Sequence, residues 1–287
     1  MFRLIDSLAF AVGARRPKRV RRYAGLAMLA LPLVAGCAGH QPPSPRAAQA
    51  PLHVLTSGGF TSALNVLAAQ YTAASGDPIV IEHGPSMGTT VNAIPARLAR
   101  GEDADVVILA RSALDDLVAQ GKVAPGTPVD LALSKIAVAV KEGAPAPDIS
   151  SPEAVRKALL AARSVAWSDS ASGVYIQTTM LDRLGVAKEV RAKGRMIPAT
   201  PVGQIVAQGD AEIGFQQLSE LLPVKGIRIV GLLPSSLQKV TAFSGGVVTA
   251  SHHPAQARAL LDFLSSAKAE KAIRASGMEP APHKVKP

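Results

Sequence analysis

The feature that most restricts the fold of this chain is an alternation of short apolar strands with amphipathic helices between residues 52 and 280. Apolar runs such as Ala104–Leu109 and Ile136–Val140 are separated by segments such as Ser112–Gln120, in which apolar residues recur at helical spacing. This rhythm predicts an α/β fold with parallel sheets and helices on both faces. Ligands of such sheets collect at the carboxyl ends of the strands, where the strand order switches.

Two stretches share one pattern, a strand followed by a small polar turn and a helix. In Leu52–Tyr71 the turn ends with Gly58 and Gly59, and in Ser164–Leu184 it ends with Gly173. Glycine permits close approach of the backbone to a ligand, and the unpaired N–H groups of a helix start attract anions. Each stretch by itself also fits an ordinary strand-to-helix turn. Because one lies in each half of the chain, we expect a ligand held from two sides.

Residues 1–36 are predicted to be a signal peptide and not part of the fold. A basic block, Arg15–Arg22, precedes the apolar run Tyr23–Ala35, which is too short to span a bilayer comfortably. The small residues before Cys37 resemble a bacterial lipoprotein signal, which implies cleavage before Cys37 and lipid on its sulfur. Residues 37–51 are rich in proline and are predicted to form a tether. We therefore expect a periplasmic lipoprotein anchored in a membrane.

Charge and cysteine content exclude several classes of function. The formal net charge is +10, and residues 1–36, with seven Lys or Arg and one Asp, account for +6 of it, which leaves +4. That balance favours an anionic ligand. Aromatic residues make up 3% and no basic stripe lies outside the signal, so nucleic-acid binding is not expected. Cys37 is the single cysteine and the histidines lack metal-ligand spacing, so neither a disulfide nor a metal site is expected.

Five segments, in this order, carry a resemblance to a known family: LTSGGFTSAL (55–64), RLARGEDADVVILA (97–110), SDSASGVYIQTTMLDRLG (168–185), TPVGQIVAQGDAEIGFQQLSEL (200–221) and ALLDFLSSAKAEKAIRASGMEP (259–280). They resemble the periplasmic solute-binding proteins of ABC importers, in particular the molybdate-binding family. The resemblance implies two Rossmann-like lobes joined by two crossing segments, with a ligand cleft between them. It assigns residues 52–130 and 240–280 to lobe one and residues 131–239 to lobe two, and leaves 281–287 as a tail.

The resemblance also implies a function. A monomeric protein of this family, without a cofactor, would deliver a small anion to a separate membrane permease and ATPase, and this sequence has no P-loop of its own. The anion would be an oxyanion such as molybdate or, in better agreement with the sequence, an organic carboxylate. Gly59 stands where molybdate binders usually carry a serine, and Gln217 stands where they carry a tyrosine. Arginine binds carboxylates in a fork, and Arg111 and Arg195 lie near predicted strand ends.

The family's cleft motifs fall on five parts of this chain: the first turn, the loop 84–90, the turn of lobe two, and the two segments around residues 202 and 217. Arg111 is added for its position after a strand. The expected ligand-binding residues are therefore Ser57, Gly58, Gly59, Ser86, Thr89, Arg111, Ser170, Ser172, Gly173, Val202 and Gln217. Two adjacent amides, Gln216 and Gln217, are unusual after an apolar strand, and we expect them to face the ligand.

An isomerase is the first enzymatic alternative. Some periplasmic proteins that resemble this family isomerise tricarboxylates such as aconitate, a proton shift that needs a base and carboxylate clamps. Arg111 and Arg195 are candidate clamps. The candidate bases are Asp169, Glu82, His83 and Tyr175. We favour binding over isomerisation, because nothing in the residue pattern demands catalysis.

A serine hydrolase is the second alternative. Residues 84–88 follow a predicted strand and fit the pattern G-x-S-x-G, with Ser86 as the nucleophile. Asp169 with His252 or His253 could complete a triad. The proline before Ser86 fits the strained elbow of such enzymes poorly, so this alternative is the weaker one.

Overall fold

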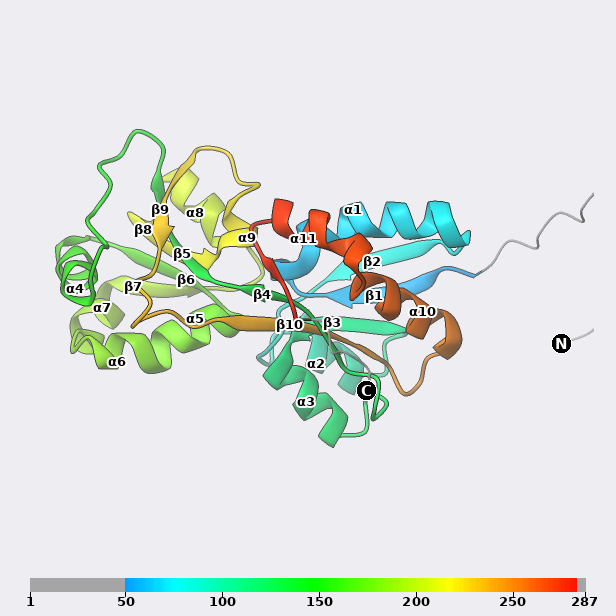
Figure 1. Ribbon diagram of the computed structural model, residues 1–287. Coiled ribbons are helices and arrows are strands. Elements are labelled where there is room, and N and C mark those ends of the chain that lie inside the picture. The colour runs from blue at the N-terminus through cyan, green and yellow to red at the C-terminus, as the bar shows by residue number, and fades with distance from the viewer. Residues whose placement is uncertain (1–49, 283–287) are drawn as a thin grey trace, which may run out of the picture. The chain divides into compact units, whose positions relative to one another are not determined.

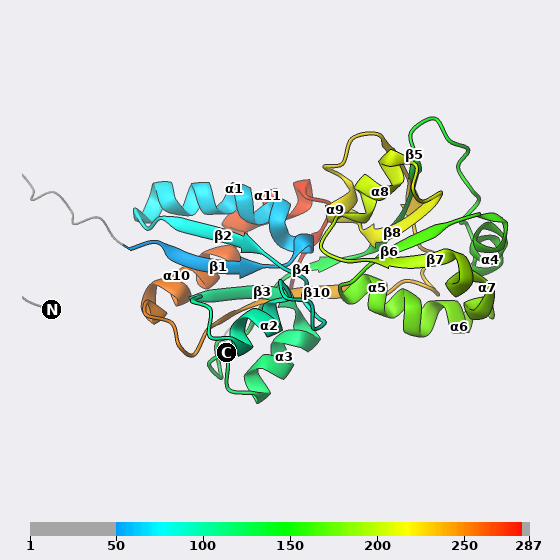
Figure 2. The same cartoon turned by 180° about the vertical axis from the view of Figure 1, so that it is seen from behind.

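The computed structural model describes residues 50–282, which form two α/β lobes (Figures 1 and 2). The expected signal peptide, most of the tether and the expected lipidation of Cys37 lie outside the described residues. Within residues 50–282, none of the helices combines the length and the apolar character that a membrane span requires.

Lobe one is built on a six-stranded sheet with the order β11-β4-β10-β3-β1-β2. β1 pairs in parallel with β2 and β3, whereas β10 is antiparallel to β3 and β4. The expectation of a parallel sheet is therefore wrong for lobe one, because β10 enters from the other lobe and runs against the strands beside it. The strands are β1 (Leu52–Thr56), β2 (Ile79–His83), β3 (Val106–Ala110), β4 (Val129–Ser134), β10 (Thr241–Val247) and β11 (Glu279–Pro280).

Helices cover both faces of this sheet, since alternate residues of each strand point to opposite sides. Val54 and Ile108 pack in one buried cluster with α1 (Gly58–Ser75), α10 (Pro254–Leu264) and α11 (Glu270–Ala275). Leu55 and Val107 face the other way and pack with α2 (Ile94–Ala99) and α3 (Arg111–Ala119). In Figure 1, α1 and α11 lie on one side of the sheet, and α2 and α3 lie on the other.

Lobe two is built on a five-stranded sheet with the order β7-β6-β8-β5-β9. β6 is parallel to β7 and β8, and β5 is antiparallel to β8 and β9, so this sheet is also mixed. The strands are β5 (Ile136–Lys141), β6 (Val165–Ser168), β7 (Gly194–Ile197), β8 (Ile213–Gln217) and β9 (Ile227–Leu232).

The helices of lobe two again flank both faces of the sheet. One face packs against α4 (Pro152–Ala161), α7 (Ala187–Lys193) and a continuous stretch made of α5 (Ala171–Tyr175), a π-helical turn over Ile176–Met180 and α6 (Leu181–Arg183). The other face packs against α8 (Val202–Gln208) and α9 (Leu218–Leu221). The Ser151 hydroxyl accepts a hydrogen bond from the Ala154 N–H at 3.1 Å, as expected of a helix cap at the start of α4.

The chain passes between the two sheets twice within the described residues. Lys135 separates β4 from β5, and residues 233–240 separate β9 from β10. The turns that follow β1, β6, β7 and β8 line one cavity, so both sheets contribute residues to the same site.

Candidate functional site

A cavity of about 380 Å³ lies between the two lobes, at the carboxyl ends of their central strands. Lobe one contributes the start of α1, the end of β2 and part of the loop that follows it. Lobe two contributes the turn after β6, the connection from β7 to α8, and the end of β8 with α9. The volume lies within the range of about 300–1,000 Å³ that is usual for small-molecule sites.

Two carboxyl groups line this cavity, those of Asp169 and Glu220. Gln216 Nε2 donates a hydrogen bond to Glu220 Oε1 at 3.0 Å. Burial raises the pKa of the Glu220 carboxyl from 4.5 to about 7, the nearby Asp169 carboxylate adds to the rise, and the hydrogen bond from Gln216 opposes it. At neutral pH this carboxyl therefore exchanges its proton readily, which suits a general acid or base.

The Asp169 carboxyl is also taken partly out of water. Burial raises its pKa, and the hydrogen bond that its Oδ2 accepts from the Ala199 N–H, at 3.3 Å, opposes the rise. Ala199 has a φ of 57°, in the left-handed region that residues other than glycine rarely adopt. Such a conformation costs about 1–3 kcal/mol and is characteristic of functional sites. Here it directs a backbone donor at a carboxylate on the cavity wall.

Positive charge in the cavity comes from few groups. Among the lining residues, His83 is the one side chain that can become a cation, and neither Lys nor Arg occurs among those described. Its Nδ1 lies 3.3 Å from the Thr61 hydroxyl, in the first turn of α1. Within the described part of the chain, α1 and α5 begin without a side-chain cap, whereas the first N–H of α8 donates to the Gln216 side chain. An anion in this cavity would therefore be held by helix N–H groups and His83.

The structure separates the three residues expected in the first turn. Gly58 lines the cavity, and Ser57 lies behind it with 1% of its surface exposed. Gly59 packs inside lobe one, because a Cβ built there would overlap the ring of Phe243. Its carbonyl oxygen accepts a hydrogen bond from the Ser219 hydroxyl of lobe two at 2.7 Å. The space at Gly59 is thus occupied by protein and not by a ligand.

The other expected residues of lobe one lie off the cavity wall. Ser86 is fully buried, and its Oγ accepts a hydrogen bond from the Ala110 N–H at 3.0 Å. Thr89 is exposed in the loop after β2. Arg111 is engaged in ion pairs with Asp115 at 2.8 Å and with Asp130 at 2.9 Å.

These positions also bear on the serine hydrolase alternative. A nucleophile must reach a substrate, and the Ser86 hydroxyl lies inside lobe one at the start of α3. His252 and His253 line a different cavity near His53, at the amino end of β1, whereas Asp169 lines the cavity between the lobes. The three residues of the suggested triad are therefore not brought together.

In lobe two, Ser170 reaches the cavity wall. Ser172 is buried with its Oγ 3.1 Å from Ser168 Oγ, and a Cβ built at Gly173 would overlap the Ser168 carbonyl, so both residues pack α5 against the end of β6. Val202 is buried too, and its N–H donates to Gln216 Oε1 at 2.9 Å.

The adjacent amides of β8 point to opposite sides of the sheet, as neighbours on a strand must. Gln216 lines the cavity. Gln217 points away from it, and its Nε2 donates to the Thr241 hydroxyl of β10 at 3.1 Å. The Gln217 Oε1 is buried and accepts no hydrogen bond from the residues that the structure describes.

Of the bases considered for an isomerase, Asp169 and His83 reach the cavity. The Tyr175 hydroxyl donates to the Leu237 carbonyl at 2.8 Å, and the Arg195 side chain donates to the Asp210 carbonyl at 3.1 Å. Glu82 forms an ion pair with Arg97 at 3.0 Å.

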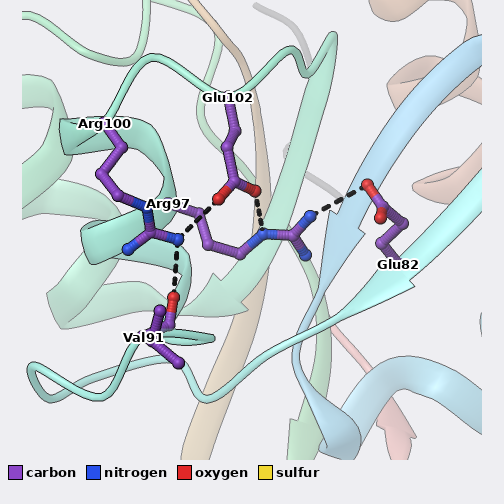
Figure 3. A network of polar contacts seen from close by, with 5 residues as sticks. All are labelled: Glu82, Val91, Arg97, Arg100 and Glu102. Atoms are coloured by element: carbon purple, nitrogen blue, oxygen red, sulfur yellow. Dashed lines mark hydrogen bonds and ion pairs between the residues drawn. The ribbon is translucent and has the colours of Figure 1, made fainter.

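Glu82 belongs to the network shown in Figure 3, which stabilises the loop after β2. Arg97 bridges Glu82 and Glu102, and Arg100 bridges Glu102 and the Val91 carbonyl. The hydrogen bond from the Arg100 guanidinium to the Val91 carbonyl, at 2.6 Å, holds the end of this loop. The next residue, Asn92, lines the cavity. The network therefore supports the cavity wall from outside.

Sequence reasoning missed Glu220 and the role of Ala199. Gln216 is the penultimate residue of a strand and Glu220 lies in the short helix after it, so no helical spacing in the sequence marks the two as neighbours. A left-handed alanine leaves no trace in the sequence. Among residues 50–282, the structure contains no group of three or more His, Cys, Asp or Glu that could hold a metal ion.

Comparisons with known proteins agree with this architecture. Residues 52–279 match the family model described as bacterial extracellular solute-binding protein. An aconitate isomerase from Pseudomonas sp is 53% identical over 231 residues, which cover 80% of this chain and 88% of that relative.

Two solved structures show the same fold. The periplasmic molybdate-binding protein of Azotobacter vinelandii superposes with a TM-score of 0.66 at 23% identity, over 81% of this chain and 100% of that one. Peb3 from Campylobacter jejuni superposes with a TM-score of 0.59 at 16% identity, over 79% and 99%. At these identities the two structures indicate the fold alone, and the expected resemblance to molybdate-binding proteins is confirmed at that level.

Proposed function

The chain belongs to the family of bacterial extracellular solute-binding proteins, and from that premise we propose that it is an isomerase of a tricarboxylate, with aconitate as its substrate. The observation that carries this proposal is the 53% identity to an aconitate isomerase over 80% of the chain. The same relationship overturns the interpretation of the chain as a binding protein that delivers an anion to an ABC importer. That interpretation is wrong, because so similar a relative is an enzyme.

The proposed reaction is an allylic proton shift. A base removes a proton from the methylene group of aconitate, which lies between a carboxylate and the double bond. The electron pair left on this carbon forms a new double bond to the central carbon, and the electrons of the original double bond move to the far carbon, which takes up a proton. Each carbon of the three-carbon chain of aconitate carries a carboxylate, so the product of the shift has the same constitution as the substrate. The new double bond can be cis or trans. Atoms and electrons balance within the substrate, so the scheme needs no co-reactant.

Asp169 and Glu220 are the proposed acid–base pair. Both carboxyls line the cavity, and both pKa values are raised by burial, that of Glu220 to about 7. A base whose pKa lies near the working pH combines availability with proton affinity. The mutual repulsion of the two carboxylates favours a state in which one is ionised and the other is protonated. One group can then remove a proton while the other donates one.

Substrate carboxylates need partners other than arginine here. His83 is the lining side chain that can meet one of them as a cation. Its Nδ1 faces the Thr61 hydroxyl, which also lies 3.3 Å from the Ser57 carbonyl, so the imidazole is oriented from behind. The N–H groups at the start of α1 are proposed to hold a second carboxylate. This set replaces the arginine clamps expected from the sequence.

Contacts between the lobes support a shielded reaction site. The Ser219 hydroxyl bonds to the Gly59 carbonyl, and the Ser86 N–H bonds to Ser170 Oγ at 3.3 Å. Both contacts join lobe one to lobe two beside the cavity. Exclusion of water strengthens the electrostatic interactions inside such a site and protects a carbanion from side reactions.

The test is to incubate the purified protein with cis- or trans-aconitate and to follow interconversion by chromatography. We expect turnover, and we expect Asp169→Asn and Glu220→Gln each to lower kcat by about 10²–10⁴-fold, the usual contribution of a positioned acid or base. Asp182→Asn is the matched control, because it removes a carboxyl that pairs with Arg191 outside the cavity. Absence of turnover in the wild-type protein would refute the proposed function, and full kcat in either cavity variant would refute the role of that residue.

The proposed location follows from the family and from the sequence. The family is extracellular, and the pattern before Cys37 supports a lipid anchor at the periplasmic face of a membrane. A tether of the length of residues 37–51 would leave both lobes free to bind a small solute from the surrounding solution.

A further inference from the structure

We propose that Gln216 is a positioning residue of this site, which fixes the Glu220 carboxyl and sets the pH at which that carboxyl exchanges its proton. The inference deepens the proposed function and rests on the role given there to Glu220. Gln216 is the penultimate residue of β8, and 3% of its surface is exposed. It lies between the start of α8 and the Glu220 side chain on α9.

The chemistry of its neighbours fixes the orientation of the Gln216 amide. The Val202 N–H can only donate, so Gln216 Oε1 must face it, at 2.9 Å. Nε2 then faces Glu220 Oε1, at 3.0 Å. A flipped amide would place its NH₂ group against the Val202 N–H and its oxygen against the carboxylate. Both contacts would be repulsive, so the amide presents a donor to Glu220 in one orientation.

The same carboxylate oxygen is confined from the other lobe. Gly58, the first residue of α1, lies so close to Glu220 Oε1 that a Cβ built on the glycine would overlap this oxygen. Oε1 therefore lies between an amide of lobe two and the backbone of lobe one. Rotation of the carboxyl away from this place would break its hydrogen bond with Gln216.

A donor in this place changes the proton affinity of Glu220. Burial favours the neutral carboxyl, whereas a hydrogen bond from Nε2 favours the ionised one. The two effects oppose each other, and the result is a carboxyl that titrates close to neutral pH and does not remain protonated throughout. Without Gln216, burial and the Asp169 charge would act unopposed by this amide.

Other groups facing Glu220 are few. The titratable side chains that line the cavity with it are Asp169, from the turn after β6, and His83, from the end of β2. The lining residues of α1 and of the connection between β7 and α8, within the part of the chain that is described, carry no ionisable side chain. The Gln217 backbone also stabilises the ionised Glu220, and substitution of a side chain leaves that contact in place.

Two variants and a control separate positioning from a structural role. Gln216→Glu keeps an oxygen for the Val202 N–H and replaces the donor to Glu220 with an acidic group. Gln216→Met removes both bonds. Gln217→Met is the matched control, because it removes an adjacent buried amide that bonds to Thr241 on the other face of the strand.

The measurement is a titration of the Glu220 carboxyl by NMR in protein labelled with ¹³C at the glutamate carboxyls. The signal is assigned by its loss in Glu220→Gln. We expect both Gln216 variants to titrate at higher pH, by about 1 pH unit or more, since a hydrogen bond to a charged group is usually worth that much. The corresponding limb of the kcat–pH profile should move in the same direction. Gln217→Met should leave both unchanged.

Titration of Glu220 at the wild-type pH in either folded variant would overturn the inference. A lower melting temperature with an unchanged titration would assign Gln216 a purely structural role and would overturn it as well. Gln216→Glu is nearly isosteric with the native residue and keeps the test possible if Gln216→Met fails to fold. Its own carboxylate also raises the pKa of Glu220 by repulsion, so the size of the shift is taken from Gln216→Met, whereas absence of any rise in Gln216→Glu overturns the inference. The titration needs no substrate, so it tests the role of Gln216 whether or not the protein is an isomerase. Absence of isomerase activity in the wild-type protein would refute the proposed function alone.

Discussion

Two adjacent glycines at the start of α1, Gly58 and Gly59, offer a test in which the same substitution should lower activity at one position and stability at the other. A Cβ at Gly58 would lie 2.2 Å from Glu220 Oε1, and ordinary contact begins at 3.4 Å, so the carboxyl would have to retreat by about 1.2 Å. The oxygen is the far end of a flexible side chain and can move without disturbing the core. Misplacement of a reacting group by about 1 Å can cost on the order of 100-fold in rate.

We therefore expect Gly58→Ala to lower kcat for aconitate by about 100-fold while the melting temperature changes little, since alanine is favoured over glycine in a helix. Gly59→Ala is the control. Its Cβ would lie 2.1 Å from Phe243 Cζ, inside the buried core of lobe one. Overpacking of this kind costs about 1–3 kcal/mol of stability, and the folded fraction should retain its activity.

The assays are chromatographic turnover at saturating aconitate and thermal unfolding of both variants. Because Gly58 touches Glu220 across the lobes, the expected pattern is a loss of activity in one variant and a loss of stability in the other. A Gly58→Ala protein with wild-type kcat would refute the placement of the Glu220 carboxyl against α1. Equal losses of stability in both variants would show that Gly58 has a packing role like that of Gly59.

Two further predictions concern pH and anchoring. The pKa of Glu220 is raised in the folded state, so its contribution to stability is fully present below the unfolded value of 4.5 and is lost as the pH rises through about 7. Glu220→Gln should therefore be more stable than the wild type at pH 8, by roughly 2–3 kcal/mol, with little difference at pH 4, as measured by denaturant unfolding; a difference independent of pH would contradict this. Cys37→Ser should move the protein from the membrane to the soluble fraction on cell fractionation, and unchanged partitioning would exclude lipidation at Cys37.

The strand and helix positions could be predicted because local patterns determine them. The strand Ile136–Lys141 begins at the residue expected from its apolar run, and α3 (Arg111–Ala119) lies within one residue of the expected helix Ser112–Gln120. The direction of β10 could not be predicted in this way. A strand that enters a sheet after a passage from the other lobe carries no local mark of its orientation. The same holds for β5, the antiparallel strand that makes the sheet of lobe two mixed.

The site was predicted less well, because its residues depend on contacts distant in sequence. Arg111 was expected to bind a ligand carboxylate, but it forms an ion pair with Asp130 of β4, which is distant in sequence. Both Gln216 and Gln217 were expected to face the ligand, but only Gln216 lines the cavity, because neighbours on a strand point to opposite sides of the sheet. Glu220 became notable only when folding placed it against Gly58 and beside Asp169.

The two passages of the chain between the sheets, at Lys135 and at residues 233–240, have a kinetic consequence. Because the walls of the cavity come from both lobes, a movement of one lobe relative to the other bends both connections and changes the width of the cavity. If the proposed isomerase activity depends on such a movement, kcat should fall as solvent viscosity rises.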